Sequence, residues 1–209
     1  MFLHLSHSLS SLRPTLHNGP GWRVSMWVQG CSLRCTKRCL NPHMLASNDK
    51  HKMSISQIMD ALETIRKRQP FEGITMLGGE PSEQPQGLAL LLASCHDRGW
   101  STMVYSGNTY EALQQQPNAQ GWLQHTDILV DGPYLEEEYD DYLAWRGSKN
   151  QRLLCLSDRY TQDMLDTAFK KQGKGFSIQI SADGHVSASG IQNRDAAFAM
   201  EKVIRNLSS

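Results

Sequence analysis

Several features that would define a class of function are missing from this 209-residue sequence. No apolar run approaches the roughly 18–20 residues that cross a bilayer. The charges balance, with 21 Lys and Arg against 21 Asp and Glu, which argues against a protein that binds nucleic acid mainly through phosphate contacts. There is no internal repeat, phosphate-binding loop, dinucleotide-binding motif or nucleophile elbow. These absences favour one globular domain, residues 1–209, that acts on neither a membrane nor a nucleic acid.

Cysteine is scarce and unevenly placed: there are five, and three of them fall within nine residues. An odd, clustered set is not the disulfide framework of a secreted domain. Acidic residues are absent from residues 1–48. A Ser-rich, acid-free start is also a feature of transit peptides, but the first dozen residues carry no charge, so we favour a basic surface around the cysteines. We expect a cytoplasmic protein whose cysteines are free or bound to metal.

From Gly21 onward, strand-like apolar runs alternate with helical patterns, which predicts an α/β fold with a mostly parallel sheet. Strands are expected at 23–29, 73–77, 101–105, 127–130 and 177–180, and helices after Ser54, around 88–95, at 110–116 and around 200–207. Ser54 and Gln57 form a possible capping box. Repeated strand–helix units in so short a chain predict an incomplete barrel of TIM type, with a flavodoxin-like open sheet as the alternative.

Three groups of polar or reactive residues are expected at the carboxyl ends of strands: Cys31–Cys39, Gly78–Pro81 and Ser106–Asn108. In barrel folds the chemistry gathers where the strands end. The sequence therefore predicts a functional site made by these three groups. The two remaining cysteines, Cys95 and Cys155, lie in apolar patterns and are expected in the core.

Cys31, Cys35 and Cys39 recur at intervals of four residues. Three thiolates without a fourth suit a 4Fe–4S cluster in which one iron stays open to a substrate. Three basic residues in this loop would stabilise thiolate over thiol and offset the charge of the cluster: Arg34, Lys37 and Arg38. Two alternatives remain open, a structural zinc site completed by His43 and a set of unrelated buried cysteines.

The motifs around these cysteines resemble the radical S-adenosylmethionine superfamily, and most closely the activating enzymes of glycyl-radical enzymes such as anaerobic ribonucleotide reductase. The resemblance covers nearly the whole chain and rests on Gly19–Arg23, Trp27–Cys35, Cys39–Pro42, Gly78–Pro81, Tyr105–Gly107, Asp127–Pro133, Trp145–Arg152, Asp183–Gly184 and Gly190. One position departs from the family pattern. Three residues separate Cys35 from Cys39, where the family has two, which shifts Cys39 and changes the adenine contact expected from Arg38.

The resemblance implies that a 4Fe–4S cluster on Cys31, Cys35 and Cys39, within a cluster loop at 30–43, binds S-adenosylmethionine and cleaves it to a 5′-deoxyadenosyl radical. It implies a cofactor site made by Arg38, Gly78, Gly79, Glu80, Ser106, Gly107 and Asp131. Chemistry supports parts of this set, because paired glycines let the backbone approach a ligand closely and Glu80 can accept hydrogen bonds from an ammonium group. Asp131 either binds ribose hydroxyls or caps a neighbouring segment.

Arg146 and Asn150 lie in a dense polar stretch after the last expected parallel strand. They either face the substrate at the mouth of the barrel or brace the loop. The resemblance implies a glycyl-radical enzyme as the partner, with a glycine Cα hydrogen as the target. A compact radical synthase or peptide-modifying enzyme is the alternative. The basic residues of the cluster loop predict an acidic, flavodoxin-like electron donor.

Overall fold

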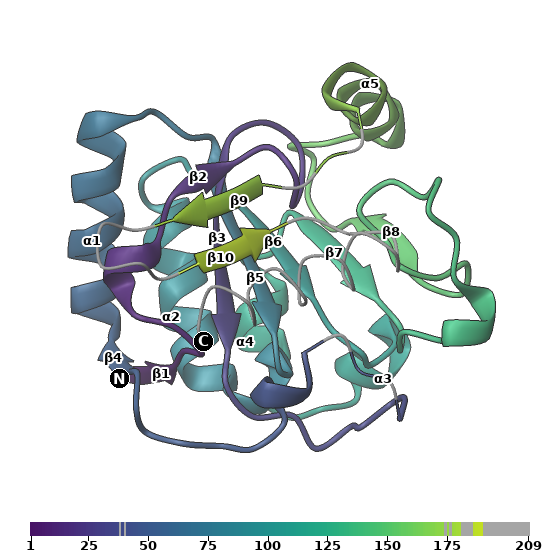
Figure 1. The fold of residues 1–209 in the computed structure, drawn as a ribbon, viewed down its shortest axis with the longest axis horizontal. Coiled ribbons are helices and arrows are strands. Elements are labelled where there is room, and N and C mark those ends of the chain that lie inside the picture. Colours follow the sequence, from purple (N-terminus) through teal and green to yellow (C-terminus); the bar gives the residue numbers. More distant parts are fainter. Residues whose placement is uncertain (38, 40, 174, 176, 181–185, 190–209) are drawn as a thin grey trace.

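The computed structural model describes residues 1–37, 39, 41–173, 175, 177–180 and 186–189. Its centre is a six-stranded sheet in the order β2-β3-β5-β6-β7-β8 (Figure 1). Four strands are parallel: β3 Arg23–Val28, β5 Gly73–Gly78, β6 Ser101–Tyr105 and β7 Ile128–Asp131. The edge strands β2 Pro14–Thr15 and β8 Arg152–Cys155 pair antiparallel with their neighbours. The expectation of a mixed α/β fold with a mostly parallel sheet is confirmed.

The order of the parallel strands follows the chain without a reversal. A flavodoxin-like sheet would contain a switch point at which the order turns back, and the described sheet has none. Successive strands are therefore always added on the same side, and their carboxyl ends form one continuous edge.

The longer helices cover the sheet. Helices α1 Ile55–Arg68 and α2 Pro85–His96 lie side by side against one face, and the short helices α3 Tyr110–Gln114 and α4 Gln120–Leu123 follow β6 (Figure 1). Helix α5 Gln162–Gln172 follows β8. The expected capping box is confirmed, because Ser54 accepts a hydrogen bond from the Gln57 amide and Gln57 accepts one from the Ser54 amide.

Several small elements complete the fold. β1 Phe2–His4 pairs with β4 Lys52–Ser54, and β9 Ser177–Ile180 pairs with β10 Val186–Ser189. The 3-10 helices are η1 Leu9–Ser11, η2 Pro42–Met44, η3 Pro81–Glu83 and η4 Glu136–Glu138. The helix expected around 200–207 and the turn at Asp183–Gly184 lie outside the described residues.

The main core lies between the sheet and helices α1, α2 and α4. It includes apolar residues of the helices that were expected after Ser54 and around 88–95. Ile58, Leu62, Leu88 and Leu91 are fully buried. Cys95 is buried in this core as expected, whereas Cys155 is only half-buried. A smaller cluster lies between the second half of the sheet and α5. Among the described residues, no helix combines the length and apolar character needed to cross a bilayer.

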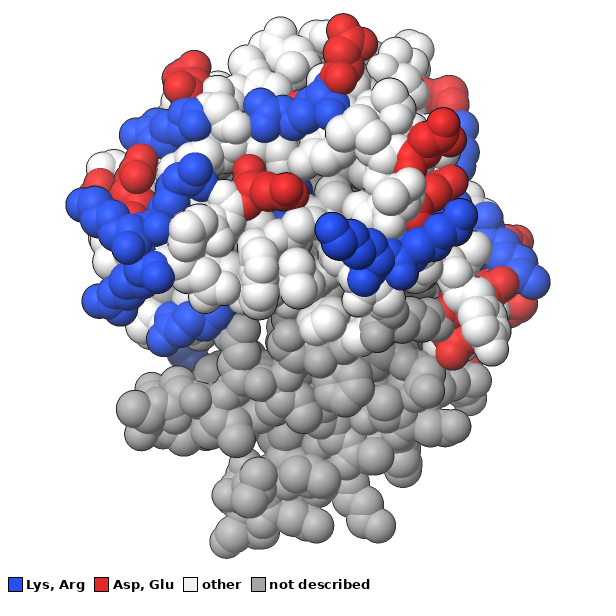
Figure 2. All heavy atoms as spheres, turned by 90° about the horizontal axis from the view of Figure 1, so that it is seen from above, with Lys and Arg blue, Asp and Glu red and all other residues white. Residues whose placement is uncertain are grey.

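The surface carries charges of both signs. On the face seen in Figure 2, Lys and Arg side chains are interspersed with Asp and Glu side chains among the described residues. This pattern agrees with the balanced composition. The face shown there does not present a large field of one sign to a partner.

Candidate active site

Four loops leave the carboxyl edge of the sheet, and together they form the candidate active site. They are the cysteine loop 30–41 after β3, the glycine turn 78–80 after β5, residues 106–109 after β6 and the long loop 132–151 between β7 and β8. The carboxyl edge is where open and barrel-type α/β folds bind their ligands. The three groups expected at strand ends are therefore at one edge of the molecule.

The cysteine loop carries three free thiols. Cys31 and Cys39 are half-buried and Cys35 is exposed. The loop is fixed where it begins, because the amides of Gly30 and Cys31 donate to the carbonyls of Met44 and Leu45 at 2.8 and 3.1 Å. Further along it, the backbone of Arg34 is left-handed, with φ of 43°. A left-handed residue other than glycine is strained, and such strain collects at functional sites.

The donor set of this loop fits an iron–sulfur or zinc centre, since soft thiolates are the ligands that these metals prefer. The structure places the thiols on one loop but does not gather them: no three His, Cys, Asp or Glu side chains in the described part of the chain lie close enough to hold a metal ion. His43, the fourth ligand of the zinc alternative, is exposed on η2. Burial raises the pKa of the Cys31 thiol, and the carboxylates of Glu80 and Glu83 raise it further.

The glycine turn lies directly against the start of the cysteine loop. The Gly79 amide donates to the Val28 carbonyl and the Glu80 amide to the Gly30 carbonyl, both at 2.8 Å. A side chain at Gly78 would meet the Val28 backbone at 2.6 Å, and one at Gly79 would meet the Gly30 carbonyl oxygen at 2.1 Å. The paired glycines were expected to let the backbone approach a ligand, and in the structure they permit a close approach to the backbone that leads to Cys31.

Glu80 is almost completely buried, with 1% of its surface exposed, and its carboxylate accepts three hydrogen bonds. The donors are the Ser82 amide at 3.0 Å, the Ser106 hydroxyl at 2.9 Å and the Gly107 amide at 2.8 Å. Burial raises the pKa of Glu80, and these donors oppose the rise. No Lys, Arg or His among the described residues forms an ion pair with this carboxylate. The structure therefore joins the predicted residues Glu80, Ser106 and Gly107 in one network.

The network extends to two further residues of the predicted groups, neither of which was assigned to the cofactor site. Asn108 donates to the Ser82 hydroxyl at 3.2 Å, and a side chain at Gly107 would meet Leu33 of the cysteine loop at 2.8 Å. Leu33 therefore lies on Gly107 and brings the cysteine loop over the Glu80 network. The sequence placed both in the expected site, since Leu33 lies within the group Cys31–Cys39 and Asn108 within the group Ser106–Asn108.

Asp131 has a different environment. Its buried carboxylate accepts a hydrogen bond from Arg152 Nε at 3.0 Å, forms an ion pair with the same guanidinium, and accepts the Tyr110 amide at 2.6 Å. Arg152 also contacts Glu111 at 2.7 and 2.9 Å, and this contact lowers the pKa of Glu111 to about 2. The Tyr110 bond caps the first turn of α3. Of the two expectations for Asp131, these contacts favour the cap over the ribose contact.

The loop that contains Arg146 and Asn150 is densely braced. Gln151 accepts hydrogen bonds from the Gly147 and Ser148 amides and donates to the Gly132 carbonyl. Asn150 donates to the Pro133 carbonyl at 2.7 Å, while its own Oδ1 is buried with no hydrogen-bond partner. Among the described residues, Arg146 donates to two backbone carbonyls, at 3.3 and 3.4 Å, and pairs with no carboxylate. Asn150 thus braces the loop, and Arg146 keeps an uncompensated charge. Arg38 lies outside the described residues.

Comparisons with known proteins bear on this site. Residues 17–154 match a family model described as a 4Fe-4S single cluster domain. The anaerobic ribonucleoside-triphosphate reductase-activating proteins of Vibrio cholerae and Pasteurella multocida are each 32% identical to this chain. The alignments cover 64% and 69% of this chain and 88% and 92% of those proteins. A pyruvate formate-lyase-activating enzyme of Clostridium pasteurianum is 29% identical over 68% of this chain and 58% of its own length.

Proposed function

Because the chain belongs to the 4Fe-4S single cluster domain family, as a radical S-adenosylmethionine protein of the type that activates glycyl-radical enzymes, we propose that it activates a partner like anaerobic ribonucleotide reductase. The reaction is the abstraction of a glycine Cα hydrogen. The observation that carries the proposal is the junction of the cysteine loop with the glycine turn, where the Glu80 amide donates to the Gly30 carbonyl. That junction puts Cys31, the first of the three free thiols, near a buried carboxylate that pairs with no described cation.

We assign Cys31, Cys35 and Cys39 as the ligands of the cluster. Three protein ligands leave one iron of a 4Fe–4S cluster open, and S-adenosylmethionine is its partner there. When bound, the cluster and this cofactor supply one-electron reductive cleavage that yields a 5′-deoxyadenosyl radical. Binding requires the thiols to lose their protons. Burial raises the pKa of the Cys31 thiol and so opposes this loss.

The chain's own contribution is to orient the cofactor and to exclude water. Gly78, Gly79, Glu80, Ser106 and Gly107 would form the wall of the cofactor site, because they surround the point where the cysteine loop crosses the glycine turn. The carboxylate of Glu80 accepts hydrogen bonds from the Ser82 and Gly107 amides and the Ser106 hydroxyl, and it pairs with no described cation. Its negative charge would attract the ammonium group of S-adenosylmethionine. Arg38 stays part of this proposal on the resemblance alone.

Arg146 is the residue that we assign to the partner protein. It carries an uncompensated guanidinium in the loop 132–151, at the same edge as the cysteine loop. Guanidinium donors can bind the backbone carbonyls of an entering loop. A glycine in that loop leaves room for the backbone to approach, because it has no side chain. We propose that the open edge is the mouth of an incomplete barrel, since the strand order follows the chain.

The electron donor is proposed from charge. Arg34 and Lys37 are exposed on the cysteine loop and pair with no described carboxylate. An acidic, flavodoxin-like protein would be attracted to this surface, and the five free cysteines suit the reducing cytoplasm. The rate of reduction by such a donor should then fall as ionic strength rises.

Electron paramagnetic resonance provides the test of function. The reduced protein, S-adenosylmethionine and the candidate glycyl-radical enzyme are mixed without oxygen, and a glycyl doublet on the partner is expected. A variant with Arg146→Ala should give less doublet than the parent while still cleaving the cofactor slowly on its own. Turnover of a small molecule or short peptide, with no doublet on any candidate partner, would instead support the synthase alternative.

A further inference from the structure

The cysteine loop is anchored by the side chain of Glu83, which lies outside the motifs described above. Ser32, which lies between Cys31 and Cys35, donates to one carboxylate oxygen of Glu83 from its amide at 2.7 Å and from its hydroxyl at 2.6 Å. Glu83 is the last residue of η3, which follows the glycine turn without a break. Two donors of one residue, its amide and its hydroxyl, fix that residue better than a single hydrogen bond does.

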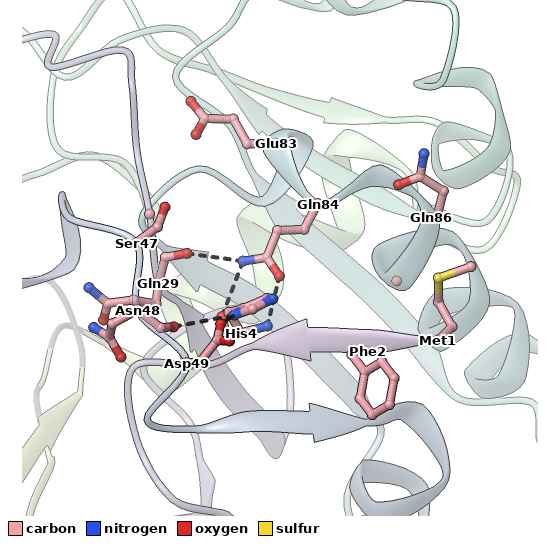
Figure 3. Close-up of a pocket in the computed structure, with 12 residues that line it drawn as sticks. Met1, Phe2, His4, Gln29, Ser47, Asn48, Asp49, Glu83, Gln84 and Gln86 are labelled. Atoms are coloured by element: carbon pink, nitrogen blue, oxygen red, sulfur yellow. Dashed lines mark hydrogen bonds and ion pairs between the residues drawn. The ribbon is translucent and has the colours of Figure 1, made fainter.

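Glu83 and the next residue, Gln84, fasten two different segments. Gln84 accepts from the His4 amide at 2.8 Å and donates to the carbonyls of His4 and Gln29 at 3.1 and 3.0 Å. Both residues line a pocket of about 590 Å³ between β1 and the start of α2. Figure 3 shows that Gln84 points to His4 and Gln29, while the carboxylate of Glu83 points away from that group. The end of η3 therefore holds the strand before the cysteine loop with one side chain and the loop itself with the other.

We propose that Glu83 is a positioning residue for the metal centre. It holds Ser32, and so places Cys31 and Cys35 relative to the glycine turn, and its negative charge makes the cluster harder to reduce. The inference rests on the proposed ligation of the cluster by Cys31, Cys35 and Cys39. Nearby charge and hydrogen bonding are among the means by which a protein sets the potential of an iron–sulfur cluster.

The two parts of the proposal can be separated by two variants. Glu83→Gln keeps an oxygen acceptor for Ser32 but removes the charge, and Glu83→Ala removes both. Asp49→Ala is the matched control, because Asp49 lines the same pocket with a carboxylate that contacts His4 and Lys52 instead of the cysteine loop. Glu83 is exposed, so its loss should leave the fold intact.

Three measurements are made on each variant: hydrogen exchange of residues 31–35 in the cluster-free protein, the rate of iron loss to a chelator, and the midpoint potential from a redox titration. With Glu83→Ala we expect iron loss about tenfold faster, from the loss of hydrogen bonds to a charged group, and faster exchange. With Glu83→Gln we expect about a threefold increase, because neutral hydrogen bonds are roughly half as strong. Both variants should shift the potential to more positive values, and Asp49→Ala should change none of the three.

A second variant checks the contact from the other side. Ser32→Ala combined with Glu83→Ala should lose iron at the rate of Glu83→Ala alone, since contacting residues do not act additively. Additive effects, or exchange and potential at the parent's values in Glu83→Ala, would overturn the inference. A parent protein that assembles no cluster would contradict the proposed ligation instead, and exchange at residues 31–35 in the cluster-free variants would still decide whether Glu83 holds Ser32.

Discussion

Two buried carboxylates stand at the ends of parallel strands in this fold, and their surroundings differ in one respect. Glu80 follows β5 and Asp131 ends β7, and each is 1% exposed. Glu80 accepts hydrogen bonds from two amides and a hydroxyl, all of them neutral donors. Asp131 accepts from the guanidinium of Arg152 as well as from an amide. We call these regions the Glu80 corner, residues 80–82 with 106–108, and the Asp131 corner, residues 110–111 with 131 and 152.

The difference is one of charge compensation. A buried charge is stabilised when it is paired, and an unpaired one retains much of its desolvation cost. Asp131 has its cation within the protein, so its charge is compensated there. Glu80 has none among the described residues, and the cysteine loop lies over it through Leu33 and Gly107. We therefore propose the Glu80 corner as the place for a cationic ligand, and S-adenosylmethionine carries both a sulfonium and an ammonium group.

The largest effect is expected when the three thiols of the cysteine loop, which lies over the Glu80 corner, are removed one at a time. Cys31→Ala, Cys35→Ala and Cys39→Ala should each abolish stable binding of the cluster, because two thiolates cannot hold it with one iron open. Anaerobic reconstitution of the parent should give about four irons and four sulfides per chain. Cys95→Ala and Cys155→Ala are the controls, and both should keep the full iron content. A complete, cofactor-cleaving cluster in Cys39→Ala would show that the longer spacing before that residue has another meaning.

The second-largest effect is expected when the carboxylate of each corner is replaced by an amide. Glu80→Gln should weaken the binding of S-adenosylmethionine to the reconstituted protein by about tenfold or more, since a hydrogen bond to a charged group is lost. Asp131→Asn should leave that affinity near the parent's value. Anaerobic equilibrium dialysis measures both. Equal losses in the two variants would remove the distinction between the corners.

The Asp131 corner should be the more sensitive in stability. Asp131→Ala leaves Arg152 without its buried partner and the Tyr110 amide, in the first turn of α3, without its acceptor. Breaking a fully buried pair costs about 3–5 kcal/mol, and here we expect about 1–3 kcal/mol because the side chain of Arg152 is 43% exposed. Thermal unfolding should show a Tm lower by about 3–10 °C. Glu111→Gln removes only the exposed contact of Arg152 and should have a much smaller effect, so comparable losses would contradict the assignment.

Much of the scaffold could be predicted from the sequence, because its periodic elements are long. The expected strand at 101–105 matches β6, the strand at 23–29 is one residue longer than β3, and the capping box of α1 is present. The elements that were missed are short or weakly patterned. In α5, Leu165 is the buried residue, which leaves too little apolar periodicity to identify the helix, and β1 has three residues.

The candidate site was less accessible to sequence reasoning. The motifs placed Glu80, Ser106 and Gly107 correctly at strand ends, because chain order alone sets which strand each follows. What each carboxylate contacts depends on pairing between distant residues. Arg152 reaches Asp131 across 21 positions, and Ser32 reaches Glu83 across 51. No spacing rule in the sequence shows such contacts.

The smallest expected effect is a difference between the two corners in how stability depends on pH, measured on the cluster-free protein. Burial raises the pKa of Glu80 above its ordinary value of 4.5. In the unfolded chain Glu80 ionises near that value, while the folded protein holds the proton to higher pH, so its contribution to stability falls as pH rises above about 4.5. The contribution of Glu111 to stability depends on pH in the opposite direction: with its pKa lowered to about 2, the contribution is present above pH 4.5 and is lost as pH falls toward 2.

Thermal unfolding between pH 2 and 7 measures both trends. The parent should lose stability relative to Glu80→Gln as pH rises above 4.5. It should lose stability relative to Glu111→Gln as pH falls below 4.5. Parallel curves for the parent and Glu80→Gln would mean that Glu80 is compensated in solution, and the two corners would then be alike.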